Sequence, residues 1–208
     1  MKNIVTIDFD IIMSPCIDLY NDLIAPNGWE YFLHIPQLQT LTADLKHYQK
    51  ITKWLIKTIK YLNKEDIVFI ENHAQIINYL DAFEKINIYN IDHHHDCGYR
   101  DDEGKLKDEL NLTCGNWGLH LKHMNLLNKF VWINNENSND PPKDKRQVNY
   151  IEYPLTTFNL DNLPCPDKLI ICLSEPWVPP MFRPLYFLWM DIFNEYFNTR
   201  FEVDYTRY

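Results

Sequence analysis

Short apolar runs that end in acidic or histidine-containing clusters recur along this 208-residue chain. Segment 2–10 alternates β-branched and polar residues, and it ends in two carboxylates. This pattern predicts a strand. The apolar runs at 66–71 (DIVFIE), 86–92 (INIYNID), 130–134 and 168–173 (KLIICL) predict further strands, because they are short and rich in β-branched residues.

Helices are predicted between these strands. Apolar residues recur every three or four positions within 41–62 and again after Pro184. Segments 74–83 and 115–128 are also predicted to be helical. Strands that alternate with helices are typical of α/β proteins. We therefore predict an α/β fold of three layers, with helices on both faces of a mostly parallel sheet. A hydrophobic content of 46% over this length fits one core, so residues 1–208 are expected to form a single domain.

Charge and composition narrow the range of partners. The net charge of −9 repels phosphate backbones, so we expect no nucleic acid partner and favour cationic small molecules or basic peptides. Asp8 and Asp10 interrupt the N-terminal apolar run, and Arg183 interrupts the C-terminal one. Neither run reads as a signal or membrane segment, so a cytoplasmic protein is expected. The five cysteines form no CxxC pair, which fits reduced thiols.

Polar clusters follow four of the predicted strands. Asp8 and Asp10 close the first strand, His73 follows the second, residues 92–96 (DHHHD) follow the third, and Glu175 follows the last. Ligands of open α/β sheets bind beyond the carboxyl ends of parallel strands. These side chains are therefore expected to converge on one site.

The acidic residues of these clusters require a cation. In an extended segment, residues two apart point to the same side, so Asp8 can join Asp10, and Asp92 can join His94 and Asp96. Buried carboxylates repel one another unless cations lie among them, and two divalent ions would meet that need. Oxygen-rich ligands with a minority of imidazole favour manganese or iron over metals that prefer thiolates, and we expect manganese. The predicted metal ligands are Asp8, Asp10, His73, Asp92, His94 and Asp96.

Simpler interpretations exist for each residue. Asp8 and Asp10 would also fit the solvated side of an edge strand. His73 would also fit the start of a helix that Asn72 caps. Glu175 would also fit a loop residue that binds backbone amides. His120, on a predicted helix, is either a packing residue or a further catalytic group.

Together the clusters resemble a known family. Asp92-x-His94-x-Asp96 resembles the DxHxD metal motif of the arginase and agmatinase superfamily, and Asp8-x-Asp10 resembles its DxD motif. His73 resembles the separate histidine ligand of that superfamily, and Glu175 its guanidinium-binding glutamate. The match is closest to a small, atypical family of peptide arginases, which convert arginine side chains of ribosomally made peptides to ornithine.

The resemblance implies a function and its residues. It implies a manganese-dependent hydrolase with two manganese ions that acts on an arginine-containing precursor peptide and releases urea and ornithine. Asp96 or Asp10 would transfer a proton to the leaving amine, and Glu175 would hold the guanidinium. No counterpart follows Asp96 for the residues that bind the α-amino and α-carboxyl groups of free arginine, which is consistent with a peptide substrate. In ordinary arginases the DxD motif follows DxHxD, so the resemblance also implies an arginase-like fold with a rearranged strand order.

Two other functions fit the same residues. Asp8-x-Asp10 ahead of Asp92-His93-His94 also resembles the motif order of the DHH family of manganese phosphoesterases. The glycine and serine that follow the first motif of that family are missing here, and basic residues are scarce beside the motifs. The other alternative is a non-catalytic interaction module that metal ions stabilise.

Overall fold

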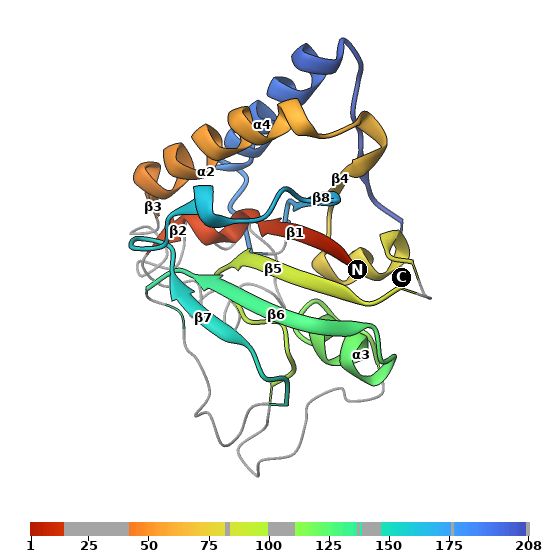
Figure 1. Cartoon of the computed structure of the whole chain (residues 1–208). Coiled ribbons are helices and arrows are strands. Elements are labelled where there is room, and N and C mark those ends of the chain that lie inside the picture. The colour runs from red at the N-terminus through yellow and green to blue at the C-terminus, as the bar shows by residue number, and fades with distance from the viewer. Residues whose placement is uncertain are drawn as a thin grey trace.

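A computed structural model describes residues 1–14, 42–81, 84–99, 111–136, 138, 147–175 and 177–206. The strands are β1 (Lys2–Asp8), β2 (Met13–Ser14), β3 (Thr42–Ala43), β4 (Ile67–Ile70), β5 (Ile86–Asp92), β6 (Leu127–Asn134), β7 (Ile151–Pro154), β8 (Lys168–Cys172) and β9 (Val203–Asp204). Seven of them form one sheet in the order β7-β6-β5-β1-β8-β4-β9 (Figure 1). Every neighbouring pair in this sheet is parallel. β2 and β3 form a separate antiparallel pair.

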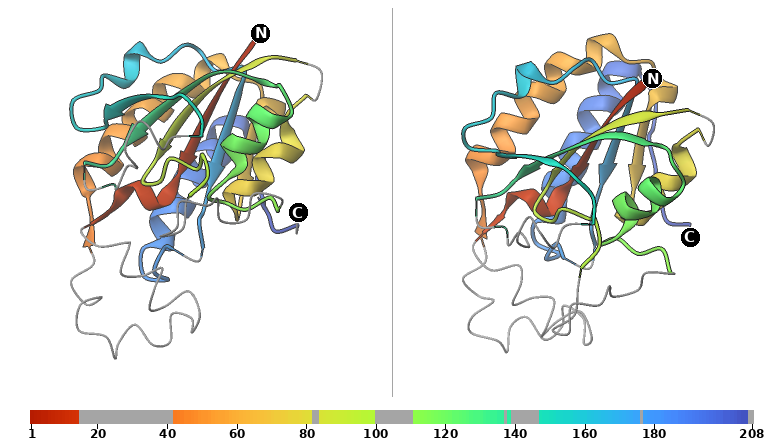
Figure 2. Two further views of the ribbon diagram at one scale, coloured as in Figure 1. Left: turned by 90° about the horizontal axis from the view of Figure 1, so that it is seen from below. Right: turned by 60° about the horizontal axis from the view of Figure 1, so that its bottom comes forward.

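Helices cover both faces of the sheet, which confirms the predicted α/β fold of three layers (Figures 1 and 2). Helices α2 (Leu45–Thr58) and α4 (Arg183–Phe197) pack on one face. Helix α3 (Trp117–His123) and the 3-10 helix η6 (His73–Tyr79) pack on the other. Further 3-10 helices among the described residues are η1 (Phe9–Ile12), η4 (Ile59–Tyr61), η5 (Lys64–Asp66) and η8 (Leu160–Asn162).

The strands are apolar on both sides because both faces of the sheet are buried. On β1, Val5 and Ile7 belong to the core beneath α2 and α4. The residue before them, Ile4, belongs to the core beneath α3. By the same alternation, Thr6 and Asp8 lie on the side of the sheet that faces α3 and η6.

Local signals in the sequence determine where the two long helices begin and end. The Asp44 carboxylate accepts hydrogen bonds from the backbone amides of Lys46 and His47, so it caps the N-terminus of α2. Helix α4 has Pro184 in its first turn, where a missing amide proton costs nothing. It ends at Asn198, which has a left-handed backbone with φ 46°.

The order of strands brings two acidic strand ends together. After β1 the chain reaches β4 on one side of β1, and after β4 it returns to β5 on the other side. Ligand sites in α/β sheets lie where the strand order reverses in this way. Ile7 of β1 pairs with Ile91 of β5, so Asp8 and Asp92 end their strands side by side.

Several predicted elements differ in extent. The predicted helix over 74–83 is the 3-10 helix η6, which ends at Tyr79. The predicted helix over 115–128 is wrong at its end, because Asn125 turns the chain with φ 59° and β6 begins at Leu127. Strands β7 and β9 carried no clear apolar signal; β7 is exposed along its length, and β9 has only two residues.

Two further predictions concern the loop over 135–147 and the absence of a membrane segment. Most of the polar loop predicted over 135–147 lies outside the described residues. Among the helices that are described, none has the length and apolar character needed to cross a membrane.

Candidate metal centre

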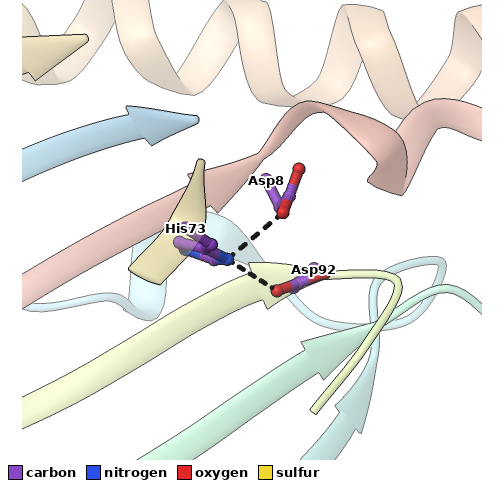
Figure 3. A group of neighbouring side chains, drawn as sticks. All are labelled: Asp8, His73 and Asp92. Carbon is purple, nitrogen blue, oxygen red and sulfur yellow. Dashed lines mark ion pairs between the residues drawn. The ribbon is translucent and has the colours of Figure 1, made fainter. Parts of the chain in front are cut away.

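Three carboxylates surround one ring nitrogen of His73. Its Nδ1 lies 3.2 Å from Asp8 Oδ2, 3.1 Å from Asp92 Oδ2 and 2.9 Å from Asp96 Oδ2 (Figure 3 shows the first two). The His73 side chain is fully buried. A ring nitrogen carries at most one proton, so it cannot satisfy three carboxylates by hydrogen bonding. Neighbouring ligand atoms of an octahedral ion lie about 3 Å apart, since each lies about 2.1 Å from the metal.

A second group lies beside the first. His94 Nδ1 is 3.0 Å from Asp10 Oδ2, and the backbone amide of His93 donates to Asp10 Oδ1 over 3.4 Å. His94 Nε2 is buried and has no hydrogen-bond partner within the described part of the chain. Such an orphaned nitrogen in a buried acidic site fits a metal ligand.

Asp92 belongs to both groups. Asp8, His73 and Asp92 form one group and Asp10, Asp92 and His94 the other, with all candidate ligand atoms of each group within 4.8 Å of one another. Two ions that share a carboxylate ligand would lie close together. The donor set of aspartate oxygens and imidazole nitrogens suits divalent manganese, iron or zinc.

Tight turns bring these residues together, whereas we expected extended segments. Asp8 ends β1, and its Oδ1 accepts the backbone amide of Asp10 in the first turn of η1 over 3.3 Å. Asp92 ends β5, and its Oδ1 accepts the amide of His94 over 2.8 Å. Asp96 then has φ 54°, which turns the chain back toward His73. Aspartate side chains favour such turns because they bond backbone amides two residues on.

The simpler interpretation of His73, as the start of a helix that Asn72 caps, describes η6 correctly. The Asn72 side chain accepts the amide of Ala74 over 2.9 Å, and Gln75 Oε1 accepts the amide of Asn72 over 2.7 Å. This capping box fixes the first turn of η6. The cap and the cluster are therefore compatible, because the helix that Asn72 caps begins with the imidazole that faces the carboxylates.

Neighbouring polar groups hold the cluster, and we did not identify them from the sequence. Ser174 Oγ donates to Asp8 Oδ2 over 2.9 Å, and Trp117 Nε1 donates to Asp96 Oδ2 over 2.7 Å. Asn90 Nδ2 donates to Asp92 Oδ2 over 3.0 Å. Thr6 Oγ1 lies 2.5 Å from His73 Nε2. Thr6 and Asn90 lie two positions before Asp8 and Asp92, so strand alternation was the signal that could have found them.

Protons take the place of cations when the cluster is metal-free. Burial, followed by the charges of Asp8 and Asp92, raises the pKa of Asp10 to about 8. Burial and the other aspartates raise the pKa of Asp92 to about 7. Burial lowers the pKa of His94, but its contact with Asp10 and the nearby negative charge raise it to about 10. The cluster therefore retains protons at neutral pH, which is the response of crowded acids without a counter-charge.

Glu175 already binds a guanidinium, that of Arg183. Arg183 Nη1 contacts Glu175 Oε1, and Nη2 donates to the Glu175 backbone oxygen over 3.0 Å. Arg183 Nε donates to the Val178 oxygen over 3.1 Å. This pair links Glu175 to the start of α4, and Ser174, the residue before Glu175, contacts Asp8. The predicted substrate-binding role of Glu175 therefore requires that a substrate replaces Arg183.

The other histidines lie outside both groups. His120 is half-buried on α3, and no contact between it and the cluster occurs among the described residues. Its catalytic role stays a prediction, and the contribution of α3 to the cluster is Trp117. His95 Nδ1 accepts the amide of Cys97 over 3.0 Å. Burial, with the nearby charge of His94, lowers the pKa of His93 to about 3.

The sequence matches no protein-family model and no curated protein, and the structure matches no solved structure. Fold and site together define an α/β protein with an all-parallel sheet and two overlapping, buried groups of aspartate and histidine that can hold metal ions. The chemistry of this centre therefore carries the functional argument.

Proposed function

We propose that this protein is a manganese-dependent hydrolase with two metal ions. It acts on the guanidinium group of arginine side chains in a ribosomally made precursor peptide and yields ornithine and urea. The observation that carries the proposal is the pair of overlapping groups that share Asp92. Asp8 and His73 complete one group, and Asp10 and His94 complete the other.

The residues fit such ions for two reasons. His73 Nδ1 and His94 Nε2 are buried without hydrogen-bond partners in the described chain. Three carboxylates lie within 3.2 Å of His73 Nδ1, and that of Asp10 contacts Nδ1 of His94. Two divalent ions held by these residues would offset that negative charge, and bound metal would lower the pKa of water and so supply a nucleophile near neutral pH.

Asp10 is the best-placed proton carrier. Its Oδ2 contacts His94, whose side chain is 19% exposed, whereas the His73 side chain is 0% exposed. Asp96 uses Oδ2 to accept the indole proton of Trp117, and the same oxygen contacts the fully buried His73 ring. A substrate that approaches from the His94 side would meet Asp10 first. Asp10 Oδ2 can then pass a proton to the leaving amine.

Three observations support the choice of a cationic substrate. The chain has a net charge of −9, which attracts a guanidinium and repels a phosphate ester. Among the described residues, no lysine or arginine contacts the carboxylates of either metal group. Glu175 already forms a charge-assisted pair with a guanidinium, and we propose that the arginine of the substrate exchanges with Arg183 there.

The test is an assay of the manganese-loaded protein on an acetylated and amidated peptide with one internal arginine. Mass spectrometry should show loss of the amidine carbon and its two nitrogens as urea, which leaves ornithine. The Asp92→Asn variant is the inactive control. An unchanged arginine together with cleavage of a model phosphodiester would reject this proposal in favour of a phosphoesterase. Manganese binding without either reaction would favour a metal-stabilised interaction module.

A further inference from the structure

The two nitrogens of the His73 ring have different surroundings. Nδ1 faces the oxygens of Asp8, Asp92 and Asp96 at 2.9 to 3.2 Å. Nε2 lies 2.5 Å from the hydroxyl oxygen of Thr6, which is a hydrogen-bond distance. A neutral imidazole has one N–H and one lone pair, and a metal ion binds the lone pair. The neighbours of the ring therefore decide which nitrogen can serve as a ligand.

Burial and strand pairing restrict the position and the rotamer of Thr6. It is fully buried on β1, a central strand that pairs with β5 through Asn90 and with β8 through Ile170. Its β-branched side chain has few rotamers in a strand. The His73 ring is also restricted, because the Trp117 ring packs against it with centroids 5.0 Å apart. A ring flip would place carbon atoms among the three carboxylates.

Position 6 does not need a hydroxyl for packing. The flanking residues, Val5 and Ile7, are buried and apolar, and valine has nearly the shape of threonine with a higher tendency to form strands. A buried hydroxyl costs free energy unless it makes a hydrogen bond, and the His73 ring is the partner that the structure provides.

We propose that Thr6 is a positioning residue that accepts the Nε2 proton of His73 and so leaves the Nδ1 lone pair facing the metal group of Asp8 and Asp92. The inference rests on the proposed metal-dependent function, and it adds a residue outside the ligand set. The opposite tautomer would place the proton of the ring on the metal side. Partners of this kind, behind metal-binding histidines, typically change metal affinity about 10- to 100-fold.

Two variants separate the hydroxyl from the volume of the side chain. Thr6→Val removes the hydroxyl and keeps the shape, whereas Thr6→Ser keeps the hydroxyl. Titration calorimetry with manganese chloride should show binding about 10- to 100-fold weaker at one of two positions in Thr6→Val, and near-wild-type binding in Thr6→Ser. Thermal unfolding of each metal-free variant reports whether it folds. Equal binding by wild type and Thr6→Val, or equal losses in both variants, would overturn the inference.

A measurement on the unaltered protein removes any dependence on folding of the variants. Nitrogen-15 NMR of the wild-type protein loaded with zinc, which is diamagnetic, distinguishes protonated from metal-bound ring nitrogens. We expect a proton on His73 Nε2 and none on Nδ1. The reverse pattern would overturn the role of Thr6 and the ligand role of His73, whereas bound zinc would still support a metal site formed by the carboxylates. Failure of the wild-type protein to bind manganese or zinc would instead reject the proposed function, and the inference with it.

Discussion

Asp92 Oδ2 lies 3.1 Å from His73 Nδ1, although two strands, β1 and β8, separate β5 from β4 in the sheet. His73 follows the end of β4 by three residues and begins η6, which packs on the face of the sheet opposite α2 and α4. Asp92 is also the residue that both candidate groups share. The fold thus places the most distant ligand of the cluster against its central carboxylate.

Asp92 should therefore matter for both metal ions, and Asp10 for one. We expect Asp92→Ala to lose most of its bound manganese, because neither group keeps its three ligands. Asp10→Asn should lose about half, because Asp10 belongs only to the group with His94. Asp161→Asn, which alters an exposed carboxylate paired with Lys57, is the matched control. Equal losses in the two cluster variants, measured by elemental analysis, would argue against separate positions.

The stability of the metal-free protein should fall as pH rises. The pKa of His94 is raised from 6.5 to about 10 and that of Asp10 from 3.8 to about 8, so both groups bind protons more tightly in the folded state. Their contribution is complete below the pKa of the unfolded chain and is lost as pH rises through the folded value. The contribution of His94 is lost between pH 6.5 and about 10. The contribution of Asp10 is lost between pH 3.8 and about 8, so the loss of stability begins at lower pH than His94 alone would give.

Manganese should reduce that loss of stability with pH, because cations then replace the protons. Thermal unfolding at about pH 6 and about pH 9, with a chelator or with manganese, tests both statements. We expect the metal-free midpoint to be lower at the higher pH and the increase caused by manganese to be larger there. A metal-free protein that becomes more stable at the higher pH would contradict the protonated cluster.

Glu175→Gln should retain both metal ions and the fold but lose arginine hydrolysis at least about tenfold, since a charge-assisted contact of about 1.5–3 kcal/mol is removed. Arg183→Lys is the comparison, because it weakens the same pair from the other side while leaving Glu175 charged. It should reduce turnover less than Glu175→Gln. Equal reductions in kcat/KM would mean that Glu175 only closes the loop after β8.

Gly118→Ala should destabilise the protein. An added Cβ would lie 3.0 Å from the backbone oxygen of Asp96 and 3.1 Å from Cys97 Sγ. Overpacking costs about 1–3 kcal/mol, which exceeds the gain of about 1 kcal/mol from replacing a helical glycine with alanine. Urea unfolding should show a net loss in the free energy of unfolding of Gly118→Ala. The comparison with and without manganese should show weaker manganese binding, because Asp96 shifts. His123→Ala, at an exposed position of α3, is the control; equal stability of both variants would contradict this packing.

Sequence patterns located the sheet and the acidic strand ends, because both depend on short-range rules. Burial on both faces makes β1, β5 and β8 apolar throughout, and this pattern is visible without a structure. The clusters did converge, but we attributed this to extended segments, and turns at Asp8 and Asp92 produce it instead. Both geometries place residues two apart near one site, so the sequence could not separate them.

Contacts between distant segments were harder to predict. Arg183 lies beyond a turn and at the start of α4, and only the folded loop brings it to Glu175. Trp117 reaches Asp96 because Gly118 allows α3 to approach the turn at Asp96 closely. Neither partner has a local signature, since each depends on how a helix packs against the sheet.

The metal content of the wild-type protein tests the central claim most directly. Protein purified in excess manganese and freed of unbound metal should contain about two equivalents by elemental analysis, because each of the two overlapping groups supplies three ligands. One equivalent or less under these conditions would contradict the account, since a single ion would leave the shared carboxylate cluster without sufficient positive charge.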